Sequence, residues 1–380
     1  MAHFDLTERY DFQQWIIKDL ETENGFTHRP QSNYNQRLAM DTDILWEFLR
    51  ATQEDEMDYL LKKLDKEVIL NLINQEIIKG GLLFALKSGV YIENKQLKLV
   101  YPKPATSFNA KAVKRYEQNR FTVMEEVVYK DQERVDLVLF LNGLALFAIE
   151  LKLNSSGQSV DDAIRQLKKR DSKNRLFKFD AGVLASFAVD TLEVYMTTEI
   201  KEQDTYFLPF NMGKGEGVDQ EAGNPHKESG PDTAYFCKEV LAKDSILQLI
   251  ERFIFLKVDR DKKGKKALIF PRYQQRRAVN RVLEDMKVNH TDSNYLIQHS
   301  AGSGKTNTIA WLAHSLVSLH DHEDRNVVDA VLIVTDRIVV DRQLQDAVQA
   351  IQHQPGVIKV MDDKATSSDL ADALAGNTKI

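Results

Sequence analysis

The sequence predicts an α/β fold in which a mixed sheet flanked by helices is followed by a second α/β unit. Two nearly all-apolar runs, residues 134–141 and 144–152, lie on either side of Asn142-Gly143, a dipeptide typical of tight hairpin turns. Such continuous apolar runs suit strands that are covered on both faces. After residue 268 the pattern changes to strands and helices that alternate around a glycine-rich loop, which is typical of a further α/β unit.

Length and composition narrow the function classes. A chain of 380 residues is longer than one typical domain, so we expect two or three. The net charge of −6 excludes a bulk nucleic-acid condenser, so any DNA binding requires local basic patches. The single cysteine, Cys237, excludes an internal disulfide and fits a reducing compartment. No signal pattern or membrane-spanning run is present in the sequence, so we expect a soluble, cytoplasmic protein without a membrane partner.

Three charged residues interrupt the apolar hairpin: Asp136, Glu150 and Lys152. Ionised groups are rarely buried unless they are paired or bound to a metal. Glu150 and Lys152 are two residues apart on a strand, so their side chains leave the same face. Two carboxylates beside an ammonium predict a divalent-metal site for phosphodiester hydrolysis. The alternative, an edge hairpin with surface charges, is disfavoured because the flanking residues are too apolar for an exposed edge.

The register of this hairpin decides whether the two carboxylates share a site. If Asn142-Gly143 formed a plain two-residue loop, Asp136 would pair with Ile149 and face away from Glu150. A shared site therefore requires a three-residue loop or a bulge, because either one pairs Asp136 with Glu150. Bulges are over-represented beside active sites, so we expect one of these two irregularities near the turn.

The remaining elements are predicted from apolar periodicity and turn residues. We expect helices over residues 7–20, 41–64, 67–79 and 243–255, a strand over 121–129, and a hairpin formed by 182–188 and 193–198. Ser159 and Asp162 have the spacing of a capping box for a helix that runs to about Arg170. Residues 258–268 are charged and contain glycine, so we interpret them as a linker between domains.

A basic cluster follows that helix and has two interpretations. It is either a stripe that contacts DNA phosphates beside the proposed metal site or a solvated face, and the pattern by itself favours the solvated face. Its members are Arg165, Lys168, Lys169, Arg170, Lys173, Arg175 and Lys178.

The glycine-rich loop of the second unit has the pattern of a phosphate-binding loop for ATP. A short strand is expected over 294–298 and a helix over 307–319, on either side of the loop. Backbone amides of such a loop wrap the phosphates, a lysine reaches the β and γ phosphates, and a hydroxyl holds Mg²⁺. The residues that match are Gly302, Ser303, Gly304, Lys305 and Thr306.

Three further observations bear on this loop. His299 stands where the strict pattern has glycine. The alternative, a glycine-rich turn with a solvent-exposed lysine, is disfavoured by the strand and helix expected around it. Gln275 is a candidate adenine contact, because its amide both donates and accepts. Residues 330–337 read as a strand that ends in polar residues, where α/β sheets place ligand contacts.

Together, and in this order, these stretches resemble the R (restriction and motor) subunit of type I restriction-modification enzymes. The resemblance rests on residues 48–53, 119–123, 134–152, 157–158 with 162–166, 187–191 with 194–198, 208–211, 272–275, 302–306 and 334–337. It implies a PD-(D/E)xK endonuclease domain over 1–257, a linker over 258–268, and the start of a RecA-like superfamily 2 motor lobe over 269–380. It also implies double-stranded DNA as substrate and the methyltransferase and specificity subunits as partners.

The resemblance assigns roles residue by residue. Asp136, Glu150 and Lys152 match the nuclease triad, with Mg²⁺ held by the two carboxylates and the carbonyl of Leu151. Lys152 then positions or activates water and stabilises the developing phosphorane charge. Gln166 matches the glutamine of a helix motif behind the triad.

Two positions depart from the family pattern. Relatives with a Gln-x-x-x-Tyr motif have tyrosine where this chain has Arg170. An acidic residue is frequent in their first helix, where this chain has Gln13 with Glu8 one turn earlier. Auxiliary roles for Arg170 and Glu8 are therefore open.

The motor region lacks parts that hydrolysis requires. A working motor needs an Asp-Glu pair after a strand and arginines from a second lobe. Asp362-Asp363 resembles such a pair, but Lys359 interrupts the strand before it. We therefore expect the N-terminal part of a longer protein, without ATPase activity of its own. Two rival hypotheses are a stand-alone metal-dependent nuclease and a non-catalytic remnant that binds nucleotide and partner proteins.

Overall fold

The computed structural model describes residues 9–104, 106, 108–215, 220–259, 264–336, 338–351, 356–361, 365–376 and 379–380. The chain forms two compact units. One consists of Met1–Lys103 and Lys111–Glu251, the other of Pro104–Ala110 and Arg252–Ile380.

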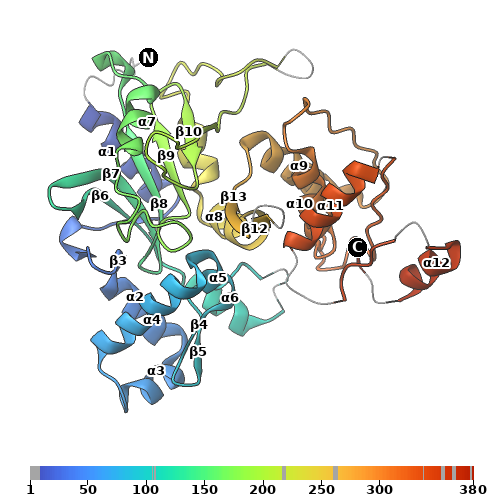
Figure 1. Ribbon diagram of the computed structural model, residues 1–380, viewed down its shortest axis with the longest axis horizontal. Coiled ribbons are helices and arrows are strands. Elements are labelled where there is room, and N and C mark those ends of the chain that lie inside the picture. The colour runs from blue at the N-terminus through green and yellow to red at the C-terminus, as the bar shows by residue number, and fades with distance from the viewer. Residues whose placement is uncertain are drawn as a thin grey trace. The chain divides into compact units, whose positions relative to one another are not determined.

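The first unit is built on a mixed sheet, as the sequence predicts. Among the described residues the sheet has nine strands, with the main order β1-β6-β7-β8-β9-β10-β11 and with β2 and β3 attached at β8. The β1–β6 and β8–β9 pairs are parallel, and the other pairs are antiparallel (Figure 1). The strands are β1 (Thr27–His28), β2 (Tyr34–Asn35), β3 (Met40–Asp41), β6 (Phe121–Lys130), β7 (Glu133–Leu141), β8 (Leu144–Leu151), β9 (Ala185–Val189), β10 (Val194–Thr197) and β11 (Leu208–Pro209).

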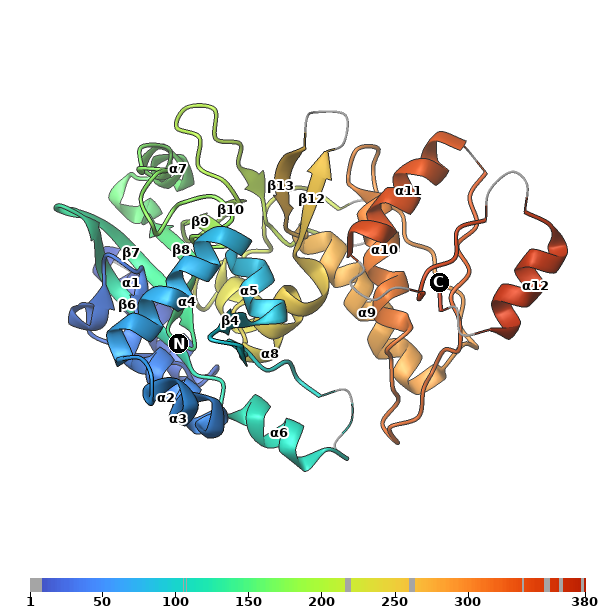
Figure 2. The same cartoon turned by 60° about the horizontal axis from the view of Figure 1, so that its bottom comes forward.

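Helices pack around this sheet. They are α1 (Arg9–Thr22), α2 (Thr42–Thr52), α3 (Glu54–Leu61), α4 (Lys66–Gly80), α5 (Leu82–Ser88), α6 (Ala110–Glu117), α7 (Val160–Lys168) and α8 (Lys243–Gln248), with π-helical turns over Phe236–Val240 and Leu249–Phe253. Figure 2 shows α2, α3, α4 and α5 grouped near β4 (Val90–Ile92). Strand β4 pairs antiparallel with β5 (Lys95–Leu97) in a small hairpin. In the described part of the chain no single helix is long and apolar enough to cross a membrane, although the bent pair α4 and α5 would pass that test together.

The helix expected over 41–64 is broken into α2 and α3 at Gln53. The backbone of Gln53 is not helical (φ −145°, ψ 51°). Its side chain accepts from the Lys98 amide at 2.6 Å and donates to the Lys98 carbonyl at 2.9 Å. The amide of Gln53 thus takes the place of a strand partner for Lys98, an interaction that apolar periodicity does not reveal.

The β7–β8 hairpin contains the bulge that the sequence requires. Leu141 pairs with Leu144 around the two-residue turn, and Phe140 pairs with Ala145, but Leu139 then pairs with Phe147. Leu146 is therefore the extra residue, and its carbonyl accepts a hydrogen bond from the Leu184 amide at 2.8 Å. Beyond the bulge the last pair is Leu137 with Ile149. The prediction of a bulge or a longer loop is confirmed, and the irregularity is a bulge.

Strand β8 lies at the centre of the first unit. All of its residues are buried, because β7 and β9 flank it and both faces of the sheet are covered. On one face, Phe147 packs edge-on against Phe187 with ring centroids 5.6 Å apart. Phe187 in turn contacts Phe210 and Phe236. This explains why the hairpin sequence is apolar at nearly every position.

The second unit contains a hairpin and four described helices. β12 (Phe255–Asp259) and β13 (Lys265–Ile269) pair antiparallel, so the range expected as a linker, 258–268, falls largely on a hairpin. The helices are α9 (Tyr273–Asn289), α10 (Lys305–Leu316), α11 (Ile338–Ile351) and α12 (Ser367–Ala375). The indole of Trp311 is buried between Phe253 and Phe255 and donates to the Phe253 carbonyl at 2.8 Å. The predicted division at residues 257 and 269 stays a prediction.

Two expected strands of this unit are wrong. Residues 294–298 and 330–336 are described and have no strand conformation, while Arg337 lies outside the described residues. Strands are stabilised by their ladder partners, and few partners are present here: the Val331 amide donates to the Lys379 carbonyl at 2.8 Å. Apolar side chains of both stretches are correspondingly exposed, Leu296 at 90% and Val334 at 82%.

Candidate active site

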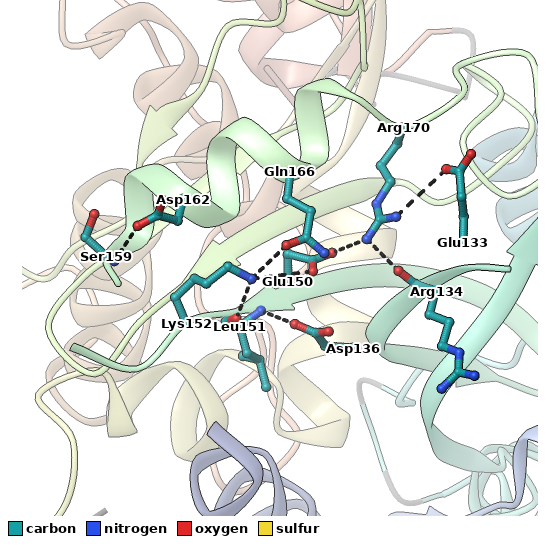
Figure 3. A network of polar contacts seen from close by, with 10 residues as sticks. All are labelled: Glu133, Arg134, Asp136, Glu150, Leu151, Lys152, Ser159, Asp162, Gln166 and Arg170. Atoms are coloured by element: carbon teal, nitrogen blue, oxygen red, sulfur yellow. Dashed lines mark hydrogen bonds and ion pairs between the residues drawn. The ribbon is translucent and has the colours of Figure 1, made fainter. Parts of the chain in front are cut away.

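The two carboxylates of the hairpin meet at the end of β7 and β8. The last pair of the β7–β8 ladder, Leu137 with Ile149, places Asp136 and Glu150 opposite each other one step further along. Their exposed fractions are 2% and 0%. Asp136 Oδ2 accepts a hydrogen bond from the Leu151 amide at 2.7 Å, which ties the strand ends together (Figure 3). The predicted geometry is therefore confirmed: both carboxylates are buried on one face.

Lys152 completes this cluster. Its side chain is 5% exposed, and Nζ donates to Gln166 Oε1 at 2.8 Å and to the Leu151 carbonyl at 3.1 Å. Nζ also lies 3.8 Å from Glu150 Oε1. The structure thus brings all the nuclease-site residues expected from the sequence into one polar network (Figure 3).

Helix α7 positions Gln166 over the strand ends. It packs against β8, β9 and β10, and its N-terminus has the predicted capping box of Ser159 and Asp162. The Asp162 carboxylate accepts from the Ser159 amide at 2.9 Å, and this backbone hydrogen bond, with help from Arg165, lowers the pKa of Asp162. The cap determines the residue at which the helix begins, and therefore which side chains face the strands. Gln166, two turns later, faces Lys152 for this reason.

Arg170 is a site residue whose position the sequence did not settle. Its Nη2 donates to Glu150 Oε2 at 2.8 Å and to the Arg134 carbonyl. Nη1 lies 3.9 Å from Glu133, and the guanidinium stands 5.5 Å from the centre of the Tyr129 ring. Burial acts to lower the pKa of Arg170, but the Glu150 carboxylate outweighs it and the pKa is raised. Only the spacing of four residues from Gln166 pointed toward the site.

The rest of the basic cluster consists of four exposed residues, the half-buried Lys168, and Arg175. Arg165, Lys169, Lys173 and Lys178 are exposed, as expected for a solvated or DNA-facing surface. Arg175 instead turns inward and donates to Asn74 Oδ1 at 2.7 Å and to the Ala181 carbonyl at 2.6 Å. Arg170 and Arg175 thus have roles inside the fold, and the DNA-contacting interpretation of the other members stays a prediction.

Gln13 of the first helix contacts strand β6. Gln13 is 2% exposed and donates to Glu125 Oε2 on β6 at 2.8 Å. It therefore binds a neighbouring strand rather than the hairpin carboxylates. Glu8 lies outside the described residues.

In the second unit the loop that is expected to bind phosphate closes on itself. Lys305 Nζ donates to the carbonyls of His299 and Ser300 at 2.9 Å each. Gly302 and Gly304 have φ of +73° and +83°, as a tightly curved loop requires. Thr306 lies in the first turn of α10. Burial, with a contribution from Lys305, lowers the pKa of His299.

Gln275 is held by the loop. Its Nε2 donates to the carbonyls of Ser303 and Gly304 at 3.1 and 2.9 Å, and its Oε1 accepts from the Arg272 amide at 2.8 Å. Both ends of the amide are thus engaged by the backbone. The adenine contact expected for Gln275 and the phosphate contacts of residues 302–306 stay predictions.

The hairpin site has donors that fit Mg²⁺. All of them are oxygens, from Asp136, Glu150 and the Leu151 carbonyl, and hard cations of this kind prefer oxygen ligands. The described residues contain no group of three or more His, Cys, Asp or Glu side chains that could hold a metal. The ammonium of Lys152 lies beside two of the same oxygens, which indicates that the position favours positive charge.

Comparisons with known proteins identify restriction enzyme subunits that are similar to this chain. Residues 268–375 match the family described as type III restriction enzyme, res subunit. Three relatives from Methanocaldococcus jannaschii are named, provisionally, as type I restriction enzyme endonuclease subunits. MjaVIIIP is 26% identical over 370 residues, MjaVIIP 26% over 252, and MjaIXP 24% over 375. These alignments cover 93%, 63% and 91% of this chain but only 32%, 22% and 34% of the relatives, so the chain spans about a third or less of their length.

The family described as type I restriction enzyme R protein N terminus matches residues 5–205, which is more than half of the 380 residues. The matched range includes the whole carboxylate site and α7. The fold class and the family expected from the sequence are both confirmed. This chain belongs to the family of type I restriction enzyme R proteins and comprises their N-terminal nuclease region with a helicase-like region after it.

Proposed function

We propose that this chain carries the Mg²⁺-dependent DNA endonuclease site of a type I restriction enzyme and the beginning of its ATP-driven motor. The convergence of Asp136, Glu150 and Lys152 in a buried network is the observation that carries the proposal. Buried carboxylates cost free energy unless a cation compensates them. A site that gathers two of them beside a lysine is suited to bind a metal ion and to act on a phosphodiester.

The residues have separate tasks in this proposal. Asp136, Glu150 and the Leu151 carbonyl would hold Mg²⁺, which supplies Lewis acidity toward the scissile phosphate and its attacking water. Asp136 also accepts a hydrogen bond from the Leu151 amide, so the contact that orients Asp136 also holds the backbone of Leu151, the residue whose carbonyl accepts from Lys152.

Lys152 provides the second positive charge. Gln166 and the Leu151 carbonyl hold its ammonium from two sides, so the charge is placed before substrate arrives. An oriented ammonium stabilises the negative charge that grows on the phosphate as water attacks. In this arrangement Gln166 positions Lys152.

The wider function rests on the comparisons. The relatives are named as endonuclease subunits of type I restriction enzymes, and the second unit matches a restriction enzyme res subunit. We therefore infer that the whole protein cuts unmodified double-stranded DNA, that ATP drives its translocation, and that methyltransferase and specificity subunits direct it to its sites.

The test is DNA cleavage by the full-length subunit assembled with its partner subunits. Asp136→Ala, Glu150→Ala and Lys152→Ala should each lower cleavage by a factor of about 100 or more, while DNA-stimulated ATP hydrolysis continues. Lys79→Ala serves as the matched control, because Lys79 is a lysine of α4 whose side chain is 79% exposed and lies 3.5 Å from Glu76. Cleavage retained by all three site variants would refute the nuclease assignment, whereas no cleavage by the original assembled enzyme would favour a non-catalytic remnant. Cleavage that needs no ATP would favour a stand-alone nuclease.

A further inference from the structure

We propose that Arg170 is a positioning residue that holds one oxygen of Glu150 and thereby directs the other toward Lys152 and the metal. The inference rests on the proposed nuclease function and deepens it. It starts from the observation that each oxygen of Glu150 faces a different cation. Oε2 accepts from Arg170 Nη2 at 2.8 Å, and Oε1 lies 3.8 Å from Lys152 Nζ (Figure 3).

Arg170 is itself anchored from several sides. The Nη2 that binds Glu150 also donates to the Arg134 carbonyl on β7, the strand that carries Asp136. Nη1 lies near Glu133, whose carboxylate accepts from the Tyr129 hydroxyl, and the Tyr129 ring lies next to the guanidinium. With 7% of its side chain exposed, Arg170 has little freedom to rotate. A planar guanidinium held in this way fixes the carboxylate that it binds.

This arrangement should affect metal binding and turnover in opposite directions. The guanidinium charge compensates the buried carboxylate before metal binds, and it repels a divalent cation close to the same carboxylate. Arg170 should therefore weaken metal binding. The hydrogen bond from Arg170 to Oε2 should at the same time increase turnover once metal is bound, because a carboxylate with one fixed orientation directs Oε1 toward Lys152 and the metal. A residue that only stabilised the fold would lower both quantities together.

Two variants separate charge from geometry. Arg170→Gln removes the charge, so we expect the Kd for Mn²⁺ to fall about tenfold and cleavage at saturating metal to fall about tenfold or more. Arg170→Lys keeps the charge but replaces the planar fork by a single ammonium. Its Kd for Mn²⁺ should stay within about twofold of the original protein, while cleavage falls as in Arg170→Gln.

The measurement combines Mn²⁺ binding to the nucleotide-free 380-residue chain, followed by electron paramagnetic resonance, with cleavage by the assembled full-length enzyme. Arg175→Gln is the matched control. Arg175 is a half-buried arginine of the same unit that binds Asn74 and a backbone carbonyl, so its loss should lower stability without changing either quantity per folded molecule.

The outcomes distinguish this inference from the proposed function. Asp136→Asn should abolish Mn²⁺ binding; if it binds Mn²⁺ as the original chain does, the metal site itself is wrong. If Asp136→Asn loses binding but Arg170→Gln binds and cuts normally, only the role of Arg170 is refuted. The same conclusion follows if Arg170→Gln loses both quantities in proportion to its stability, as a merely structural residue would. Tighter binding together with slower cleavage supports the proposal.

Discussion

Gly143 is the residue on which the hairpin turn depends. It has φ +81°, and a Cβ there would lie 2.2 Å from the Asp41 carbonyl oxygen and 2.7 Å from the Leu45 amide. Gly143→Ala should therefore lower the free energy of unfolding by more than about 2 kcal/mol, since both backbone strain and a clash with backbone atoms oppose it. Gly157→Ala is the matched control, because Gly157 has φ +76° but nothing within 4 Å of its Cβ position. Urea denaturation should show a clearly smaller loss for Gly157→Ala; equal losses would show that the contact with Asp41 is unimportant.

Tyr129 makes the fold sensitive to alkaline pH. Burial, with the hydrogen bond to Glu133, raises the pKa of Tyr129 to about 12 from its ordinary value of 10.0. The folded protein therefore keeps this proton where the unfolded chain loses it. The resulting stability is complete below pH 10 and is lost as the pH rises toward 12. Tyr129→Phe should show a shallower loss of stability than the original protein between pH 10 and 12 in denaturant titrations, and identical slopes would contradict this account.

The site residues differ in how far the sequence could predict them. Asp136, Glu150 and Lys152 were predictable because ionised groups are exceptional within an apolar hairpin. Arg170 was not, because it belongs to a run of basic residues and only the folded chain shows that it follows the end of α7 and turns inward to Glu150. Sequence pattern likewise could not show that Gln275 binds the loop backbone, since those partners lie almost thirty residues away.

The bulge in β8 can be tested by two deletions of one residue each. Deleting Leu146 removes the extra residue and leaves the pairs from Leu139–Phe147 onward unchanged. This should preserve the opposition of Asp136 and Glu150 while costing about 2–5 kcal/mol of stability for one buried leucine. Deleting Ala148 shifts Glu150 by one position relative to β7, and a one-residue slip reverses the face of a side chain.

We therefore expect Mn²⁺ binding to survive deletion of Leu146 and to vanish on deletion of Ala148. Circular dichroism should confirm that each variant is folded before the titration. Equal Mn²⁺ affinities in the two folded variants would contradict the assignment of the metal site to this register.

The elements of the first unit were predicted well where a local pattern determines them. The bulge followed from counting the residues between Asp136 and Glu150, and α7 followed from its capping box. The break at Gln53 was missed because its cause is a contact with Lys98, far along the chain. The charged range 258–268 is interpreted as a linker from the sequence because it shows no strand pattern. The hairpin that forms there is largely exposed, so apolar and polar residues do not alternate along its strands.

The two units differ in whether the strands that their sequences predict are formed. In the first, every strand of the central hairpin has neighbours, and its apolar residues are buried. In the second, the stretches 294–298 and 330–336 have apolar sequences but expose Leu296 and Val334. A strand pattern states which residues suit a sheet, whereas the sheet forms only where hydrogen-bonding partners are present. For this reason the family match to residues 268–375 is stronger support for a motor-type region than its described strands are.

The same difference leads to an expectation for the 380-residue chain as a whole. We expect it to bind nucleotide weakly and to show no DNA-stimulated ATP hydrolysis. Lys305 is bonded to two carbonyls of its own loop, so phosphates must displace these contacts, and the described residues show no strand that leads into the loop. Hydrolysis further requires an acidic pair that holds Mg²⁺ and arginines that stabilise the transition state.

Release of phosphate from ATP, measured with and without DNA, tests this expectation, with Lys305→Ala as the matched control. The original chain and Lys305→Ala should give the same background rate. Steady ATP hydrolysis that Lys305→Ala abolishes would show instead that the loop is competent within these 380 residues, and that nucleotide readily displaces the contacts of Lys305 with its own loop.

DNA itself should bind weakly and lose affinity steeply as salt increases, because the net charge is −6 and only local patches such as the exposed Arg165, Lys169 and Lys173 are basic.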